Sequence, residues 1–222
     1  MTKGFFIAGT DTGVGKTRVS CALLQAFAAG GKKVAGMKPV AAGCENGQWM
    51  DVELLVAASN VAAPREQICP YSFVPPLAPH IAALQASIQI DLKVIRQAYI
   101  ELNNHAEVVI VEGIGGFLVP LNDQEDGADL AKTLGLPVIL VVGMRLGCLN
   151  HALLTVKAIQ VAGLRLSGWV ANCIDPKMMA LEENIQSLKQ RLDCPLLGVL
   201  PFDEQIDSNE PSGLLHISKL SD

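Results

Sequence analysis

Short apolar runs alternate with longer segments of mixed polarity along the chain. Six of these runs predict β-strands, because they are nearly continuous in apolar, largely β-branched residues. They lack the apolar–polar alternation of a half-exposed strand, which is typical of strands buried on both faces of a parallel sheet. The six runs are 4–9, 33–38, 107–112, 137–142, 167–172 and 196–200.

The segments between these runs carry apolar residues at helical spacing. In 16–29, for example, Ala22, Leu23, Ala26 and Phe27 share one face of a helix. The alternation of strands and helices predicts a doubly wound α/β fold, with a mainly parallel sheet, helices on both faces and right-handed crossovers. The predicted helices are 16–29, 51–58, 91–103, 127–134, 148–162 and 176–192.

No linker or internal repeat divides the sequence, so 1–222 is predicted to form a single domain. The segment 62–79 contains five prolines and is expected to be a long irregular connection between crossover elements. Such connections are often functional. The polar tail after about residue 203 is expected to be partly mobile.

Composition narrows the classes of function. The 222 residues are 50% hydrophobic and 18% charged, which argues against intrinsic disorder. The formal net charge is -5 and no run of Lys or Arg occurs, so nucleic acid is not an expected partner. The longest apolar stretch, 136–142, is too short for a membrane span. No secretory signal pattern is visible, and a cytoplasmic location is expected.

The cysteines and histidines do not predict a metal centre. None of the six cysteines forms a CxxC pair, and the four histidines are scattered. In a chain of this length the cysteines are expected to be reduced thiols in core or half-buried positions.

The segment 9–17, Gly-Thr-Asp-Thr-Gly-Val-Gly-Lys-Thr, is the strongest motif. It follows a predicted strand and opens a predicted helix, which is the context of a phosphate-binding P-loop. Backbone N–H groups of such a loop converge on an anion, and Lys16 would add positive charge near the β- and γ-phosphates. The Thr17 hydroxyl is suited to Mg²⁺. The motif therefore predicts a P-loop NTPase-like protein that uses ATP and Mg²⁺.

The loop departs from the common pattern, which has glycine six residues before the lysine. Thr10 occupies that position, and the glycine comes one residue earlier, at Gly9. A variant class, the partitioning and division-site ATPases, carries a second lysine early in the loop. Asp11 stands at that place here, which argues against that class.

Two acids and a second lysine are expected near the loop. Glu112 ends an apolar strand and Lys38 ends another, and ligand crevices of α/β sheets lie beyond the carboxyl ends of strands. Glu112 would hold Mg²⁺, although a strand-end acid can also be a cap or a surface group. Lys38 would add a cation to the crevice. Asp51 opens the next helix, and from spacing alone it is an ordinary acid at a helix N-terminus.

Taken in order, these motifs resemble the dethiobiotin synthetase family over 5–202. The P-loop alone is shared with many ATPases, but the combination is specific. The segments that carry the resemblance are 9–12 with 14–17, 38–41, 79–80, 111–113 with 115–116, 137–143, 146–148 with 150–152, and 168–172.

The resemblance implies an ATP-dependent cyclo-ligase. In this family an amine of 7,8-diaminononanoate captures CO2 as a carbamate, and ATP phosphorylates the carbamate. The second amine then closes the cyclic urea. The implied partners are the diamine and CO2 or bicarbonate, and no nucleophilic side chain is needed.

The resemblance also implies roles for individual residues. Thr12, Lys16 and Lys38 correspond to catalytic residues, and Asn172 corresponds to the residue that reads the adenine edge. Thr17, Asp51 and Glu112 correspond to magnesium ligands. The resemblance therefore gives Asp51 a more specific role than that of an ordinary acid at a helix N-terminus. The implied nucleotide site comprises Gly13, Val14, Gly15, Lys16, Thr17, Arg18, Asp51, Glu112, Gly113, Ile114, Gly115, Asn172, Cys173, Pro201, Phe202 and Asp203.

The substrate side carries two departures. Many family members have serine where this chain has Ala42, beside the substrate, and some have glutamate at Gly13. Lys38 and Ala42 are the implied substrate contacts from one subunit. The start of a helix in a second subunit is implied to hold the substrate carboxylate, so a homodimer with shared sites is expected. The residues of that helix start are Gly147, Cys148, Leu149 and Asn150.

Three other functions are weighed against the cyclo-ligase. A partitioning ATPase would need a second loop lysine and often a basic amphipathic tail, and neither is present. A cobyrinate-type amidating enzyme would need a glutamine-hydrolysing domain, for which 222 residues leave little room. A catalytically lapsed homologue would not be expected to keep Lys16, Lys38 and Glu112.

Overall fold

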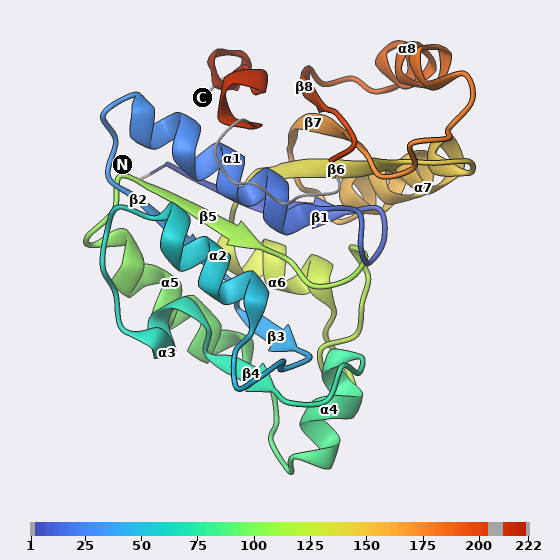
Figure 1. Cartoon of the computed structure of the whole chain (residues 1–222). Coiled ribbons are helices and arrows are strands. Elements are labelled where there is room, and N and C mark those ends of the chain that lie inside the picture. Colours follow the sequence, from blue (N-terminus) through green and yellow to red (C-terminus); the bar gives the residue numbers. More distant parts are fainter. Residues whose placement is uncertain (1–2, 204–210, 221–222) are drawn as a thin grey trace.

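The computed structural model describes residues 3–203 and 211–220. The centre of the molecule is a sheet of six strands in the order β2-β5-β1-β6-β7-β8, and every neighbouring pair of strands is parallel. All six predicted strands are therefore confirmed, and so is the doubly wound α/β fold (Figure 1). The strands are β1 (Lys3–Gly9), β2 (Val34–Met37), β5 (Val108–Glu112), β6 (Val138–Met144), β7 (Leu166–Cys173) and β8 (Leu196–Leu200).

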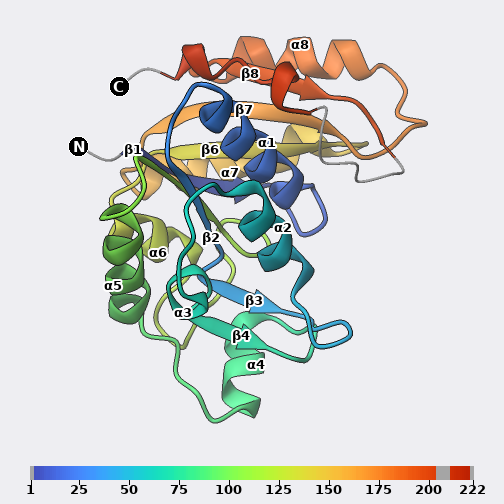
Figure 2. The same ribbon diagram turned by 60° about the vertical axis from the view of Figure 1, so that its left-hand side comes forward.

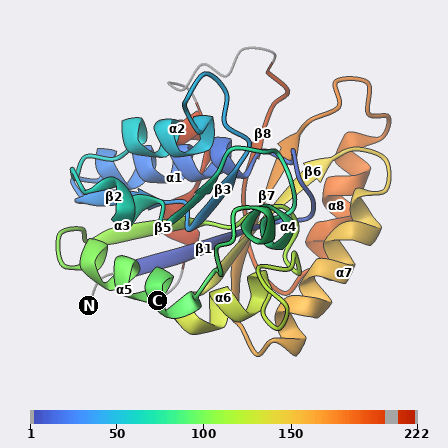
Figure 3. The same ribbon diagram turned by 90° about the horizontal axis from the view of Figure 1, so that it is seen from below.

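Helices cover both faces of this sheet (Figure 3). Side chains of β1 alternate between two cores, with Phe5 and Ile7 in one and Phe6 and Ala8 in the other. The first core is closed by α1 (Lys16–Ala29) and by the two short 3₁₀ turns η1 (Pro211–Leu214) and η2 (Ile217–Lys219). The second is closed by helices that include α5 (Leu92–Asn103), α6 (Gly127–Leu134), α7 (Cys148–Val161) and α8 (Leu181–Arg191).

The proline-rich connection is more regular than the sequence predicts. Within 62–79 the chain forms α3 (Arg65–Ile68) and β4 (Tyr71–Phe73), and β4 pairs in parallel with β3 (Val40–Ala42). The helix α4 (Pro79–Gln85) then begins at its proline, which is favoured in a first turn because its missing N–H would have no partner there. These elements form a small unit at one end of the main sheet (Figure 2). The expectation of an irregular connection is therefore wrong for 65–68 and 71–73, and 74–78 is irregular as expected.

Helix boundaries otherwise follow the prediction, with one larger difference. The helix expected over 176–192 begins only at Leu181. The Asp175 side chain accepts a hydrogen bond from the N–H of Lys177, and Ala180 has a left-handed φ of 54°. Both features form a turn, which delays the start of the helix. The helix α2 (Met50–Ala58) begins one residue before its expected start.

The tail expected to be mobile falls partly outside the described residues, namely at 204–210 and 221–222. The part that is described, 211–220, packs back onto the molecule. Leu215 and Leu220 are buried in the same core as Leu23. No helix in the described ranges is long and apolar enough to cross a membrane.

The strand order determines where the site lies. The first strand, β1, is flanked by β5 and β6, and its carboxyl end leads directly into the glycine-rich loop 10–15. Since all six strands are parallel, the residues that follow β1, β2, β5 and β7 gather at the same edge of the sheet.

Candidate functional site

The glycine-rich loop wraps around the ammonium group of Lys16. Lys16 Nζ donates to the carbonyl oxygen of Asp11 at 3.0 Å and to that of Gly115 at 2.6 Å. Gly13 and Gly15 have φ of 72° and 88°, a left-handed conformation that favours glycine. The helix α1 starts at Lys16, so its free N–H groups face the same space. The loop therefore has the geometry of an anion-binding site.

A cleft of about 830 Å³ opens over the loop at the carboxyl ends of the strands. The residues expected in the site that line this cleft are Thr12, Gly13, Gly15, Lys16, Thr17, Arg18, Lys38, Ala42, Asp51, Glu112, Ile114, Gly115, Asn172, Cys173, Phe202 and Asp203.

Three further expected residues contact the site through their backbone. The carbonyl oxygen of Gly113 accepts a hydrogen bond from Lys38, that of Val14 accepts one from Asn172, and that of Pro201 accepts one from Arg18. The Val14 side chain itself is buried in the core.

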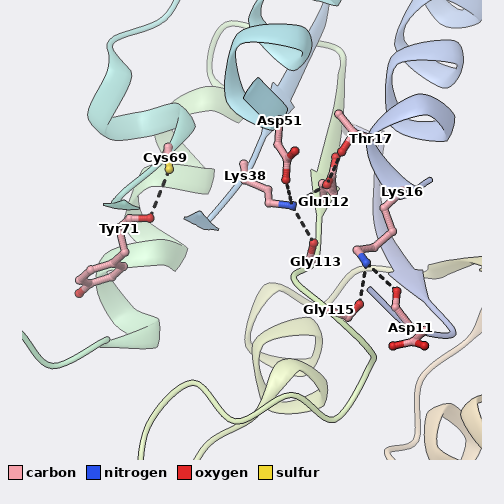
Figure 4. Close-up of polar contacts among 10 residues, drawn as sticks. All are labelled: Asp11, Lys16, Thr17, Lys38, Asp51, Cys69, Tyr71, Glu112, Gly113 and Gly115. Carbon is pink, nitrogen blue, oxygen red and sulfur yellow. Dashed lines mark hydrogen bonds and ion pairs between the residues drawn. The ribbon is translucent and has the colours of Figure 1, made fainter. Parts of the chain in front are cut away.

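A cluster of charged side chains around the buried Lys38 lines the cleft (Figure 4). Lys38 Nζ lies 2.5 Å from Glu112 Oε1, 2.9 Å from Asp51 Oδ2 and 3.2 Å from the carbonyl oxygen of Gly113. The Thr17 hydroxyl donates to the same Glu112 oxygen at 2.9 Å. Lys38 and Glu112 are only 3% and 1% exposed, so their charges interact in a poorly solvated environment.

The two lysines have opposite pKa shifts. Burial lowers the pKa of Lys38, but the carboxylates of Glu112 and Asp51 outweigh burial, and the net pKa lies above its ordinary value. The pKa of Lys16 is lowered to about 8, first by burial and second by the positive charge of Lys38. The carboxylates therefore favour the charged form of Lys38, while Lys16 is a cation that can lose its charge under mildly alkaline conditions.

The residues expected to bind magnesium fit a magnesium ion. Thr17, Asp51 and Glu112 offer hydroxyl and carboxylate oxygens, the donors that Mg²⁺ prefers. Glu112 Oε2 is buried and has no hydrogen-bond partner among the described residues, so it can still accept a ligand. No group of three or more His, Cys, Asp or Glu side chains is placed to hold a metal ion within 3–203 and 211–220.

The thiols near the cleft do not form a nucleophilic centre. Cys69 donates a hydrogen bond to the carbonyl oxygen of Tyr71 at 3.3 Å, and burial raises its pKa to about 11 (Figure 4). Burial likewise raises the pKa of Cys21 to about 12. Since the thiolate is the reactive form, neither group is activated for attack.

Beside the phosphate loop, three elements meet around Asn172 at the end of β7. Asn172 Nδ2 donates to the carbonyl oxygen of Val14 at 2.9 Å, and its Oδ1 accepts from Arg18 at 3.1 Å. Arg18 also donates to the carbonyl oxygen of Pro201 at 2.7 Å. The loop 201–203 is thereby tied to the first turn of α1.

The start of α7 does not line the cleft of this chain. Gly147 is the N-cap residue with φ of 92°, Cys148 is buried, Leu149 is half-buried, and Asn150 is exposed. Just before this segment, Arg145 forms an ion pair of 2.6 Å with Asp11 of the phosphate loop. The expected carboxylate-binding residues are thus separate from the cluster of Lys38.

The sequence interpretation missed the apolar wall of the cleft. The sequence features that could have indicated this wall are the position of Met50, next to Asp51, and the prolines of the long connection. Apolar lining residues have no chemical signature that separates them from core residues. They are Met50, Leu54, Pro76, Leu77, Ala78, Pro79, Val119 and Ile174.

Several proteins are similar to this chain over almost its whole length. A family model described as an AAA domain matches residues 3–210. A protein of Nitrosospira multiformis named ATP-dependent dethiobiotin synthetase BioD is 65% identical over 220 residues, which cover 99% of this chain and 97% of the relative. One of the same name from Aromatoleum aromaticum is 55% identical, with 97% of each chain covered.

Solved structures resemble the fold at much lower identity. The septum site-determining protein MinD of Pyrococcus horikoshii, in complex with Mg-ADP, matches with a TM-score of 0.61 and 18% identity, covering 99% of this chain and 89% of the other. MinD of Aquifex aeolicus matches with a TM-score of 0.59 and 17% identity, covering 99% and 95%. At these identities the likeness shows the fold alone.

Proposed function

The chain belongs both to the AAA-domain family and to the ATP-dependent dethiobiotin synthetases, and we propose that the cleft above the phosphate loop is its active site. The enzyme is a ligase of biotin synthesis that joins CO2 to 7,8-diaminononanoate at the expense of ATP. The observation that carries the assignment of the site is the buried pair of Lys38 and Glu112, joined by the half-exposed Asp51, beside the phosphate loop.

The reaction forms two C–N bonds through a phosphorylated intermediate. One amine adds to CO2 and loses a proton, which gives a carbamate. A carbamate oxygen attacks the γ-phosphorus of ATP, and ADP leaves. The second amine attacks the same carbon, phosphate leaves, and the cyclic urea closes. The substrate supplies both nucleophiles, which agrees with the raised pKa of Cys173 in the cleft and of Cys69 and Cys21 near it.

The two lysines and Thr12 are the proposed catalytic residues. Lys38 is held as a cation by two carboxylates and would orient the anionic carbamate. Lys16, at the start of α1, would neutralise charge that develops on the transferred phosphoryl group. Thr12 is exposed in the loop toward the cleft, where it would contact the same group.

Thr17, Asp51 and Glu112 are the proposed ligands of Mg²⁺. When bound, the ion would withdraw charge from the phosphate oxygens and help to orient them. Glu112 joins this metal site to Lys38, because its Oε1 contacts the ammonium group while its Oε2 has no partner in the described part of the chain. The phosphate side and the carbamate side of the cleft thus share one carboxylate.

The nucleotide base is proposed to lie at the end of the cleft formed by Asn172, Cys173 and the loop 201–203. An Asn carboxamide has both a donor and an acceptor for the adenine edge. The substrate carboxylate is proposed to bind the helix start 147–150 of a second subunit, since those residues lie outside the cleft of their own chain. Ala42 and Gly13 would shape the substrate end without adding side-chain hydrogen bonds.

The test is an assay of the purified protein with ATP, MgCl₂, bicarbonate and 7,8-diaminononanoate. We expect phosphate release that depends on the diamine, with one dethiobiotin formed per phosphate. Phosphate release that does not depend on the diamine would instead point to a switch ATPase.

A cytoplasmic location is proposed as well, and fractionation of the producing cell tests it.

A further inference from the structure

The carboxamide of Asn172 is held in one orientation by partners of fixed polarity. A guanidinium group can only donate hydrogen bonds and a carbonyl oxygen can only accept them. Arg18 donates to Oδ1 at 3.1 Å, and Nδ2 donates to the carbonyl oxygen of Val14 at 2.9 Å. Turning the amide by 180° would place its N–H groups against the guanidinium and its oxygen against the carbonyl. Both hydrogen bonds would then be lost, and donor would face donor and acceptor would face acceptor.

The surroundings reinforce this orientation. Asn172 is 3% exposed and packs tightly on the phosphate loop, so that a Cβ at Gly15 would lie 2.1 Å from Nδ2. Arg18 is itself fixed, because its second hydrogen bond goes to the carbonyl oxygen of Pro201 at 2.7 Å. Three segments of the chain therefore determine which end of the amide is the acceptor.

A fixed amide distinguishes adenine from guanine. Each end of the Asn172 amide keeps one further hydrogen-bonding position, one acceptor on Oδ1 and one donor on Nδ2. Adenine presents an amino donor beside a ring acceptor, which suits that pair. Guanine presents an oxygen where adenine has its amino group, so it would need the amide turned around. Only a free amide could turn to meet it.

We infer that Arg18 is a specificity-determining residue that selects adenine by fixing the orientation of the Asn172 amide. Arg18 acts through Asn172 and need not touch the base. This inference rests on the proposed role of Asn172 in binding the base. It makes Arg18 a positioning residue as well as part of the wall of the cleft.

The test compares kcat/KM for ATP and for GTP in Arg18→Met, Asn172→Ala and the double variant. Methionine keeps the length of the side chain and removes the donor. We expect Arg18→Met to lower the ratio of kcat/KM for ATP to kcat/KM for GTP about tenfold. In the Asn172→Ala background, Arg18→Met should change the ratio less than about twofold, because the two residues act as a unit.

The matched control is Arg96→Met, which removes an exposed arginine of α5 outside the cleft and should leave the ratio as in the wild type. An ATP-to-GTP ratio that is unchanged in Arg18→Met would overturn the inference. So would a double variant in which the two substitutions change that ratio independently of each other. An unchanged ratio in Asn172→Ala would instead remove Asn172 from base binding. Melting temperatures of all variants show whether each one is folded.

Discussion

At the scale of single residues, the site depends on a cation that two carboxylates hold inside the protein. Lys38 is almost fully buried, and its ammonium group contacts both Asp51 and Glu112. A buried charge is costly unless it is paired, so the buried Lys38 and Glu112 depend on each other, while Asp51 is about half exposed. The same pairing would keep Lys38 charged for the proposed anionic substrate, so one contact would serve both stability and function.

Replacing Lys38 by methionine should therefore have two separate effects. Turnover should fall by about a thousandfold, because the cation that orients the carbamate is lost. The free energy of unfolding should fall by about 3–5 kcal/mol, because Glu112 is left buried and unpaired. Denaturant titration and phosphate release measure the two effects. In Lys38→Met with Glu112→Gln, stability should recover in part while activity stays low. Recovery of both would remove Lys38 from catalysis.

Lys16 should make nucleotide binding sensitive to pH. Its pKa in the protein without nucleotide is lowered to about 8, so the cation is present below that pH and is lost as the pH rises through it. The affinity for MgATP, measured by calorimetry without the diamine, should decrease above about pH 8. Lys16→Arg keeps its charge and should give a flat profile over the same range. An affinity that stays constant up to pH 9.5 in the wild type would contradict this account.

Residue types and their positions at strand ends predicted most of the polar part of the site, and the family resemblance added Asp51. Lys16, Thr17, Lys38, Asp51 and Glu112 all line the same cleft, although they come from four separate parts of the chain, namely the start of α1, the residue after β2, the start of α2 and the end of β5. The apolar wall was not predictable, because residues such as Leu54 and Val119 have the same character as core residues. Their place in the cleft depends on tertiary packing.

At the scale of elements, two loops that would act on different substrates are joined by one ion pair. Arg145, between β6 and α7, contacts Asp11 of the phosphate loop at 2.6 Å. Asp11 also accepts a hydrogen bond from the N–H of Thr12 at 2.7 Å. The start of α7, with its proposed role in binding the carboxylate, is thereby linked to the loop that would bind ATP.

Arg145→Ala should loosen this link with little loss of stability. Both side chains are partly exposed, so the free energy of unfolding should change by less than about 1 kcal/mol. The KM for the diamine should rise several-fold, because the start of α7 loses its support. Initial rates over a range of diamine concentrations measure this effect, with Arg96→Met as the control. An unchanged KM would separate the two loops functionally.

The elements predicted best are those with a simple physical signature. Buried parallel strands such as β6 are continuous in apolar residues, and all six were found. The short strands β3 and β4 were missed because three residues are too few to show a periodic pattern. Proline at the start of α4 suggested a break in structure, although proline is well tolerated in a first helical turn.

At the scale of the whole molecule, the active site is proposed to form between two copies of the chain. Lys38 and the helix start 147–150 do not line one cleft in a single subunit. If the site forms between subunits, Lys38 of one copy would act with Gly147 of the other. The fold itself followed from sequence patterning, whereas this arrangement comes from the family resemblance.

Mixing two inactive variants tests the shared site. Lys38→Met removes the cation, and Gly147→Asp places a negative charge where the substrate carboxylate should bind. Co-refolded at equal amounts, the two chains should regain about a quarter of the wild-type activity, because half of the dimers are mixed and each mixed dimer has one intact site. Each variant refolded alone is the control. No recovery in dimers shown to be mixed would place both residues in the same subunit's site.

The most direct test of the whole account follows the oxygen atoms of CO2. With ¹⁸O-labelled CO2, a single turnover is quenched before the label exchanges with water, and phosphate and dethiobiotin are analysed by mass spectrometry. Attack of a carbamate on the γ-phosphorus predicts one labelled oxygen in the released phosphate and one in the urea carbonyl. Unlabelled phosphate formed together with dethiobiotin would contradict the phosphorylated carbamate and the roles proposed for Lys16 and Lys38.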